Sequence, residues 1–302
     1  MRKITVFVLL IMVSMPLMVS AQRYKQRWKS YRTELHFGMG VTNFLGELGG
    51  ANQIGTDYLK DLEIKETNLA ISGGFRYRLS QVLSLNNTLT YGRISGDDAL
   101  TEEFFRNYRN LNFRSDIIEA SSNLEFAFIR EQMGARYRLK GVRGVRGFEL
   151  SAYGFVGLGV FYFNPKGEYR GEWVNLADLN TEGQGLDDTR KDYSRIQLAI
   201  PVGIGFKYSI DRRWSVGLQY GMRKTFTDYI DDVSKTYYSP SALTAANGSL
   251  AAEMADKSDQ EFPYITAVGE QRGDPRDKDS YMFAIFSLSY KLRTGRSSFP
   301  MF

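Results

Sequence analysis

His36 and Glu34 are the only residues of this chain whose types and spacing suggest acid–base catalysis. Side chains two positions apart on a strand point to the same face, so the two would be neighbours. A catalytic site also requires a nucleophile and an orienting group, and no segment supplies them near this pair. The chain has one histidine and no cysteine, which excludes a multi-histidine metal cluster, thiol catalysis and disulfides. We therefore predict a protein that is not an enzyme and holds neither a cofactor nor a metal.

Two further motifs lie in expected loops. Arg272-Gly273-Asp274 matches the integrin-binding tripeptide, but three residues recur often by chance. The acidic pairs Asp97-Asp98, Asp187-Asp188 and Asp231-Asp232 could bind calcium. Calcium loops need ligands at spaced positions, which these pairs lack. We interpret the pairs as parts of solvated acidic loops.

Residues 195–225 alternate between two kinds of side chain. One face is aliphatic and aromatic, the other is polar or glycine, and the turn Asp211-Arg212-Arg213 divides the run. Period two predicts an antiparallel hairpin, with strands about twice the usual length. An apolar face about 25 Å tall opposite a polar face is typical of a transmembrane β-barrel.

The same alternation recurs in six other segments, at residues 31–42, 68–79, 83–91, 118–128, 148–163 and 282–292. The fifth of them is irregular because Tyr153, Phe155 and Phe161 interrupt its small face. The count predicts an all-β fold, an eight-stranded antiparallel transmembrane β-barrel with short periplasmic turns and long extracellular loops. The last loop would run from about Phe226 to Asp279.

A soluble eight-stranded barrel of the lipocalin type is the alternative, since alternation does not say which face points outward. The glycine-rich face with both signs of charge suits a crowded lumen better than a solvated wall. Aromatic residues at the inner strand ends also favour the membrane: Tyr31, Tyr77, Tyr208 and Trp214.

Eight strands enclose only enough space for side chains, so we predict a plugged lumen and no aqueous channel. Buried charges need partners, and the inward face offers both signs. The residues predicted to fill the lumen are Glu34, Arg76, Glu119, Glu125, Gln197, Gln219 and Arg223.

The first residues have the features of a secretory signal peptide. Arg2 and Lys3 precede an apolar run at residues 4–13, and Val19-Ser20-Ala21 is a small-residue cleavage site. We predict a signal peptide at 1–21, an outer-membrane barrel at 22–293 and a periplasmic tail at 294–302. The expected location is the cell outer membrane, with its lipid as the first partner.

Charge is distributed unevenly between the two ends of the predicted barrel. The net charge of +5 is modest, and we expect no nucleic-acid partner. Residues 226–279 hold eleven acids against five bases, whereas the inner connections and the tail, with Lys291, Arg293 and Arg296, are basic. Inner bases could pair with anionic lipid headgroups or dock an acidic periplasmic partner, and both remain open. The residues predicted to contact a partner are Arg136, Arg138, Lys140, Arg143, Arg146, Arg212 and Arg213.

Four local sequences resemble one family. They are Gly40-Val41-Thr42-Asn43-Phe44-Leu45-Gly46-Glu47-Leu48, residues 110–115, residues 157–166, and Arg272-Gly273-Asp274-Pro275 with Asp279-Ser280-Tyr281. They are similar, in the same order, to motifs of the PorG-like outer-membrane β-barrels of Bacteroidetes, and the resemblance spans roughly residues 40–290.

The resemblance implies a non-enzymatic component of the type IX secretion system that contacts its periplasmic ring. None of the four motifs can be carried over as a partner site, so the choice of the basic inner face rests on charge. The alternative is a surface barrel whose long acidic loops bind an external ligand or stabilise the envelope.

Overall fold

The computed structural model describes residues 31–46, 48, 66–131, 149–211 and 213–293. Barrel strands and outer elements follow in this order: β1 (Thr33–Leu45), β2 (Asn68–Arg78), β3 (Leu83–Asp97), η4 (Asp98–Leu100), α2 (Phe104–Arg109), β4 (Asn112–Ile129), β5 (Leu150–Tyr169), β6 (Glu172–Asn175), β7 (Ile196–Ser209), β8 (Trp214–Thr225), α3 (Pro240–Asn247), α4 (Ser249–Ala255) and β9 (Ser280–Leu292). Among these residues, no helix has the length and apolar character to cross a bilayer.

Eight of the nine described strands close into a barrel, because each of these eight has an antiparallel neighbour on each side. The order runs β4-β3-β2-β1-β9-β8-β7-β5, and pairing of β4 with β5 closes the ring. The first and last strands pair from Thr33↔Leu292 to Leu45↔Ser280. Strand β6 lies outside the ring and pairs with β5. The predicted eight-stranded antiparallel barrel is confirmed, and it leaves no open sheet edge in its wall.

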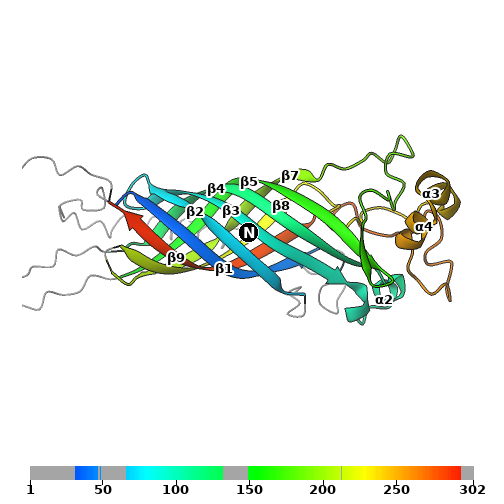
Figure 1. The fold of residues 1–302 in the computed structure, drawn as a ribbon, viewed down its shortest axis with the longest axis horizontal. Helices are drawn as coiled ribbons and strands as arrows, with labels where there is room; N and C mark the ends of the chain where they lie inside the picture. The colour runs from blue at the N-terminus through cyan, green and yellow to red at the C-terminus, as the bar shows by residue number, and fades with distance from the viewer. Residues whose placement is uncertain (1–30, 47, 49–65, 132–148, 212, 294–302) are drawn as a thin grey trace, which may run out of the picture.

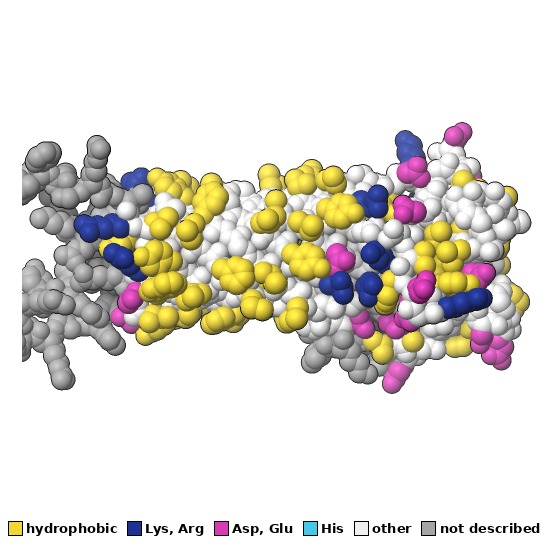
Figure 2. All heavy atoms as spheres, viewed as in Figure 1, with side chains coloured by type: hydrophobic (Ala, Val, Ile, Leu, Met, Phe, Trp, Pro, Cys, Tyr) yellow, Lys and Arg dark blue, Asp and Glu magenta, His cyan; other side chains and the backbone are white. Residues whose placement is uncertain are grey.

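The outer wall is apolar, as a bilayer requires. Figure 2 shows hydrophobic side chains spread along the barrel. Phe37, Leu89 and Leu198 on the strands of the wall remain 58%, 60% and 58% exposed. At the inner rim Trp214 lies against Tyr290, with ring centroids 4.8 Å apart. A soluble barrel would not expose this surface, so the lipocalin alternative is wrong and the protein is an outer-membrane barrel.

The irregular segment of β5 is explained by the lumen. Tyr153, Phe155 and Phe161 point inward and are buried. On the facing strands, a Cβ added at Gly205 or Gly221 would collide with the Tyr153 or the Phe155 ring. Glycine on β7 and β8 therefore makes room for large rings on β5, and the aromatic residues that break the pattern are interior packing.

Strands β3, β4 and β5 extend further outward than their period-two patterns predict, to Asp97, from Asn112 and to Tyr169. Beyond the lipid-facing band the pattern inverts, because Ile94 and Phe113 point inward into an apolar core and polar side chains point out. Around this core the outer loops fold into a cap, and Figure 1 shows α2, α3 and α4 gathered at that end of the barrel. We call residues 98–111, 176–195 and 226–279 the outer cap.

Candidate functional site

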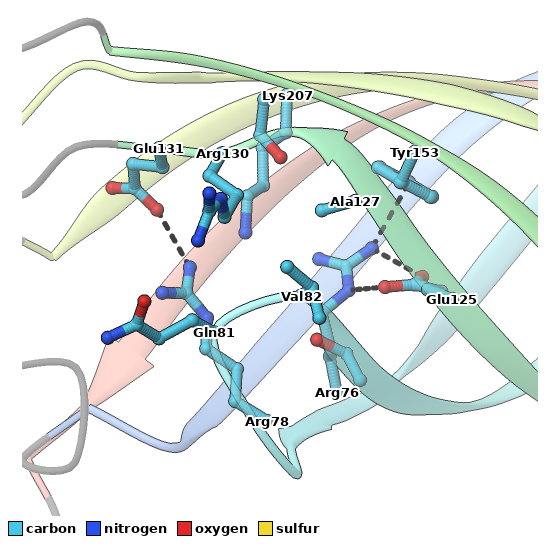
Figure 3. A pocket seen from close by; sticks show the side chains of 12 residues that line it. Arg76, Arg78, Gln81, Val82, Glu125, Ala127, Arg130, Glu131, Tyr153 and Lys207 are labelled. Atoms are coloured by element: carbon cyan, nitrogen blue, oxygen red, sulfur yellow. Dashed lines mark hydrogen bonds and ion pairs between the residues drawn. The ribbon is translucent and has the colours of Figure 1, made fainter. Parts of the chain in front are cut away.

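An ion-pair network fills the inner half of the lumen, and Arg76 is at its centre (Figure 3). Its guanidinium donates to both carboxylate oxygens of Glu125, at 2.6 and 2.9 Å, and to Glu34 at 2.8 Å. Lys207 Nζ approaches the second Glu34 oxygen at 2.9 Å. All four side chains are at most 7% exposed. The predicted charged lumen is confirmed for Glu34, Arg76 and Glu125.

Two members of this network were expected elsewhere. Lys291, expected on the basic inner surface, is fully buried and donates to Glu131 at 2.5 Å. Glu131, the acid of the basic connection, also accepts from Arg78 at 2.7 Å. The expectation for Lys291 is wrong because it lies directly opposite Glu34 on the neighbouring strand and so faces inward. Lys207 and Lys291 both fall on the polar face of the alternation, so the sequence pattern could have identified them as lumen residues.

A second ion pair lies in the outer half of the lumen. Arg223 donates to Glu119 at 3.0 Å, and the Tyr281 hydroxyl donates to the same oxygen at 2.9 Å. Tyr153 donates to Gln219, whereas the Gln197 amide donates to the Ser194 carbonyl at the outer end. Glu119 and Arg223 are therefore confirmed as lumen residues. The Gln197 side chain instead forms its hydrogen bond with the backbone three residues away.

The space left at the inner end is small. A cavity of about 40 Å³ lies among Arg76, Arg78, Glu131 and Lys207 (Figure 3). Since one water needs roughly 10–15 Å³ of such volume, it holds only a few waters. The arrangement fits a plugged barrel rather than a conducting one.

The side chains of the candidate acid–base pair, His36 and Glu34, have other partners. His36 Nε2 lies 2.8 Å from Asn86 Oδ1, while Glu34 accepts from Arg76 and Lys207. Both side chains are thus committed to structural partners inside the barrel.

The outer cap is built around buried ion pairs. Arg272 is 3% exposed and donates to Glu182 at 3.0 Å and to the Asp232 and Ala255 carbonyls. Arg109 donates to both oxygens of Asp98, at 2.7 and 3.0 Å. Because the Arg272 guanidinium is enclosed, the tripeptide Arg272-Gly273-Asp274 does not present an integrin-type motif.

Acidic side chains gather beneath the cap surface, where Asp231 and Asp232 are fully buried. Asp231 accepts from the Leu48 and Val233 backbones, Asp232 from Tyr193 and Thr181. Burial raises the pKa of Asp232 to about 6, although the positive charge of Arg272 acts to lower it. Burial likewise raises the pKa of Asp228 to about 6, and it raises that of Asp231 well above its usual range.

The expectation of solvated acidic pairs is therefore wrong for Asp231-Asp232 and for Asp98, which are enclosed by the cap. Asp187 and Asp188 are exposed as expected. Within the described ranges, no group of three or more acidic or histidine side chains is placed to hold a metal ion.

The predicted partner-contact residues fall mostly outside the described ranges, namely Arg136, Arg138, Lys140, Arg143, Arg146 and Arg212. Arg213 is described and lies exposed in the β7–β8 turn at the inner rim. Its backbone amide donates to Asp211 at 2.6 Å, and its guanidinium donates to the Tyr290 hydroxyl at 2.9 Å. Contact of these residues with a partner stays a prediction.

Comparison with known proteins shows the family of this sequence. Residues 6–247 match the family model described as "Domain of unknown function (DUF6089)". The chain belongs to this family. No curated protein matches this DUF6089 member.

Several solved structures are similar to this DUF6089 chain. The Ail attachment invasion locus protein of Yersinia pestis is 8% identical, covering 87% of this chain and 99% of its own, with a TM-score of 0.37. Neisserial surface protein A is 9% identical over 87% and 96%, with a TM-score of 0.34. OprG of Pseudomonas aeruginosa is 10% identical over 87% and 98%, with a TM-score of 0.35.

Proposed function

We propose that this outer-membrane barrel is a PorG-like accessory of the type IX secretion system that contacts the periplasmic ring of the machinery. Four ordered sequence motifs support the proposal. The observation that carries it is the filled lumen, in which Arg76, Glu34 and Glu125 are locked together. A barrel that conducts nothing acts through its surfaces, and its inner connections are basic in sequence. Complementary charge would steer an acidic periplasmic partner to that side.

The test reverses the charge of the four–five connection. Changing Arg136, Arg138, Lys140, Arg143 and Arg146 to glutamate should abolish co-purification of periplasmic ring proteins while the barrel stays folded. Folding is checked by the shift in gel mobility of unheated samples. The control reverses three exposed bases at the outer end, Arg170, Lys191 and Arg276. Unchanged co-purification of the inner variant, or equal loss in both, contradicts the docking role.

A second candidate function is binding of an external ligand by the outer cap. It is favoured because the outer loops are folded and enclose buried ion pairs such as Arg272–Glu182. A secretion role through the inner face survives changes in the cap, and a ligand-binding role does not.

A further inference from the structure

An open groove lined by aromatic rings lies on the outer cap, between α2 and the segment 259–264. Phe104 and Tyr108 are one helical turn apart, with ring centroids 6.2 Å apart and planes within 20°. Phe262 packs against both rings, at 6.0 and 5.7 Å. Its backbone amide donates to the Tyr108 hydroxyl at 2.7 Å, which fastens the segment to the helix.

The groove has a volume of about 400 Å³, within the range of small-molecule sites, roughly 300–1,000 Å³. Its walls are Ala99, Phe104, Asn107, Tyr108, Asn110, Asp259, Glu261 and Phe262. This lining contains two carboxylates and no lysine or arginine. Asp259 and Glu261 are both exposed at the rim, so the groove combines aromatic faces with negative charge.

The aromatic platform is held in place from below. The Glu103 carboxylate caps the N-terminus of α2 by accepting from the Phe105 and Arg106 amides. At the other end Arg109 is clamped by Asp98. Phe104 is nevertheless 54% exposed, and it lies on the polar cap rather than in the lipid band. Among the residues that the structure describes, none covers this packed aromatic surface, and such a preformed surface is suited to a ligand because little ordering is needed on binding.

We propose that this groove binds an arginine side chain of a basic polypeptide outside the cell. A guanidinium is planar, stacks on aromatic faces and matches carboxylates with its fork of donors. The groove is open at the cap surface, so a passing chain can insert one side chain while its backbone stays outside. The inference is independent of the secretion role and specifies the external ligand of the second candidate function, on which it rests.

A sugar is the competing occupant, since aromatic rings with polar neighbours also bind carbohydrate. Each of the two amides that would serve a sugar already directs an N–H to a backbone carbonyl of the cap. Asn107 Nδ2 donates to the Thr101 carbonyl at 3.1 Å, and Asn110 Nδ2 is directed to the Lys257 carbonyl. The lining combines two carboxylates with ring faces and contains no base, and this combination favours a cation.

The test measures fluorescence polarisation of a labelled glycine pentapeptide with a central arginine, mixed with the full chain in detergent micelles. Replacing arginine with neutral citrulline should weaken binding about tenfold, and replacing it with lysine about threefold. The double variant Asp259→Asn, Glu261→Gln should lose about tenfold, and Phe104→Leu about threefold. The matched control, Asp188→Asn with Glu270→Gln, removes the same charge from exposed positions elsewhere in the cap and should leave affinity unchanged.

Equal binding of the citrulline peptide overturns the proposal, as does equal weakening by the control pair, which would indicate general attraction to an acidic cap. Binding of maltopentaose that Phe104→Leu weakens and the double variant leaves unaltered assigns the groove to carbohydrate instead. Absence of peptide binding by a protein whose cap resists protease also overturns it. The cap could then still bind another external ligand, and the ring co-purification experiment tests the secretion role separately.

Discussion

The lumen and the outer cap both bury charge, but they compensate it differently. In the inner lumen, Arg76, Arg78, Lys207 and Lys291 face Glu34, Glu125 and Glu131, and each acid has at least one cation within 3.0 Å. In the cap, Asp228, Asp231, Asp232 and Glu182 are all buried, and among the described residues only Glu182 of these four forms an ion pair, with Arg272. Strand register can bring opposite charges face to face. The cap also holds the ion pairs Arg272–Glu182 and Arg109–Asp98, but its other buried aspartates rely on backbone donors, hydroxyls and protons. The lumen is therefore held together by ion pairs, whereas the stability of the cap depends on the pH.

The largest effect is expected from breaking the lumen lock. Arg76→Met leaves Glu125 without its two guanidinium bonds and Glu34 with one fewer cation. Removal of one partner of a buried pair costs about 3–5 kcal/mol. The measurement is urea unfolding of the refolded barrel in lipid vesicles. A loss below about 1 kcal/mol would mean that these charges are not energetically coupled.

The corresponding change in the cap is Arg272→Met. It leaves the Glu182 carboxylate buried, although backbone amides of Ser234 and Lys235 still donate to it. We expect a loss of about 3 kcal/mol that is confined to the cap, because the barrel wall does not depend on this residue. Protease sensitivity of residues 226–279 should rise while the heat-induced gel shift of the barrel is retained. A barrel that melts as early as the Arg76 variant would contradict the separation of the two regions.

A change of pH should affect the stability of the cap. Because burial raises the pKa of Asp228 and Asp232 to about 6, the folded cap binds protons that the unfolded loops have released. The stabilisation of the cap by these protons is complete below about pH 4 and is lost as the pH rises through 6, by about 2 kcal/mol between pH 5 and 7.5. Hydrogen exchange of residues 226–279, compared at pH 5 and 7.5 after correction for intrinsic rates, measures it. The variant Asp232→Asn should flatten the dependence, and an unchanged slope would refute the cause.

The smallest effect is expected from the ion pair on the outer wall. Arg93 contacts Asp116 at 2.8 Å, but the two side chains are 42% and 37% exposed. Exposed pairs contribute about 0–1 kcal/mol, so Arg93→Met should shift the urea midpoint far less than Arg76→Met. This variant is the matched control for the lumen experiment. A loss of several kcal/mol would show that burial does not set the difference.

The sequence predicted the barrel wall because lipid on one side imposes a strict period of two. It did not predict the outer ends of β3 and β4, where Ile94 and Phe113 turn the apolar face inward. Glu34, Arg76 and Glu125 were predicted to line the lumen, but their pairing depends on register across four strands. Lys291 was misplaced because a cation near the chain end was interpreted as surface charge.

The cap was the least predictable region. Arg272 donates to Glu182, which is 90 positions away in the sequence. Loops have no periodic pattern from which such a contact could be predicted. The aromatic groove likewise joins α2 to a segment more than 150 residues away. Its one local signal is the pair Phe104 and Tyr108 at helical spacing, which needs the partner segment before it becomes a site.

The extra length of the strands determines where the cap stands. Strand β5 continues beyond Tyr162, one of its last lipid-facing residues, to Tyr169. At about 3.3 Å per residue and a tilt of about 40°, this extension adds roughly 15–20 Å above the bilayer. The extended strands therefore hold the cap above the lipid headgroups. A chain-like ligand can reach the side of the cap by moving parallel to the membrane, so anything that crowds the cell surface at that level controls access to it.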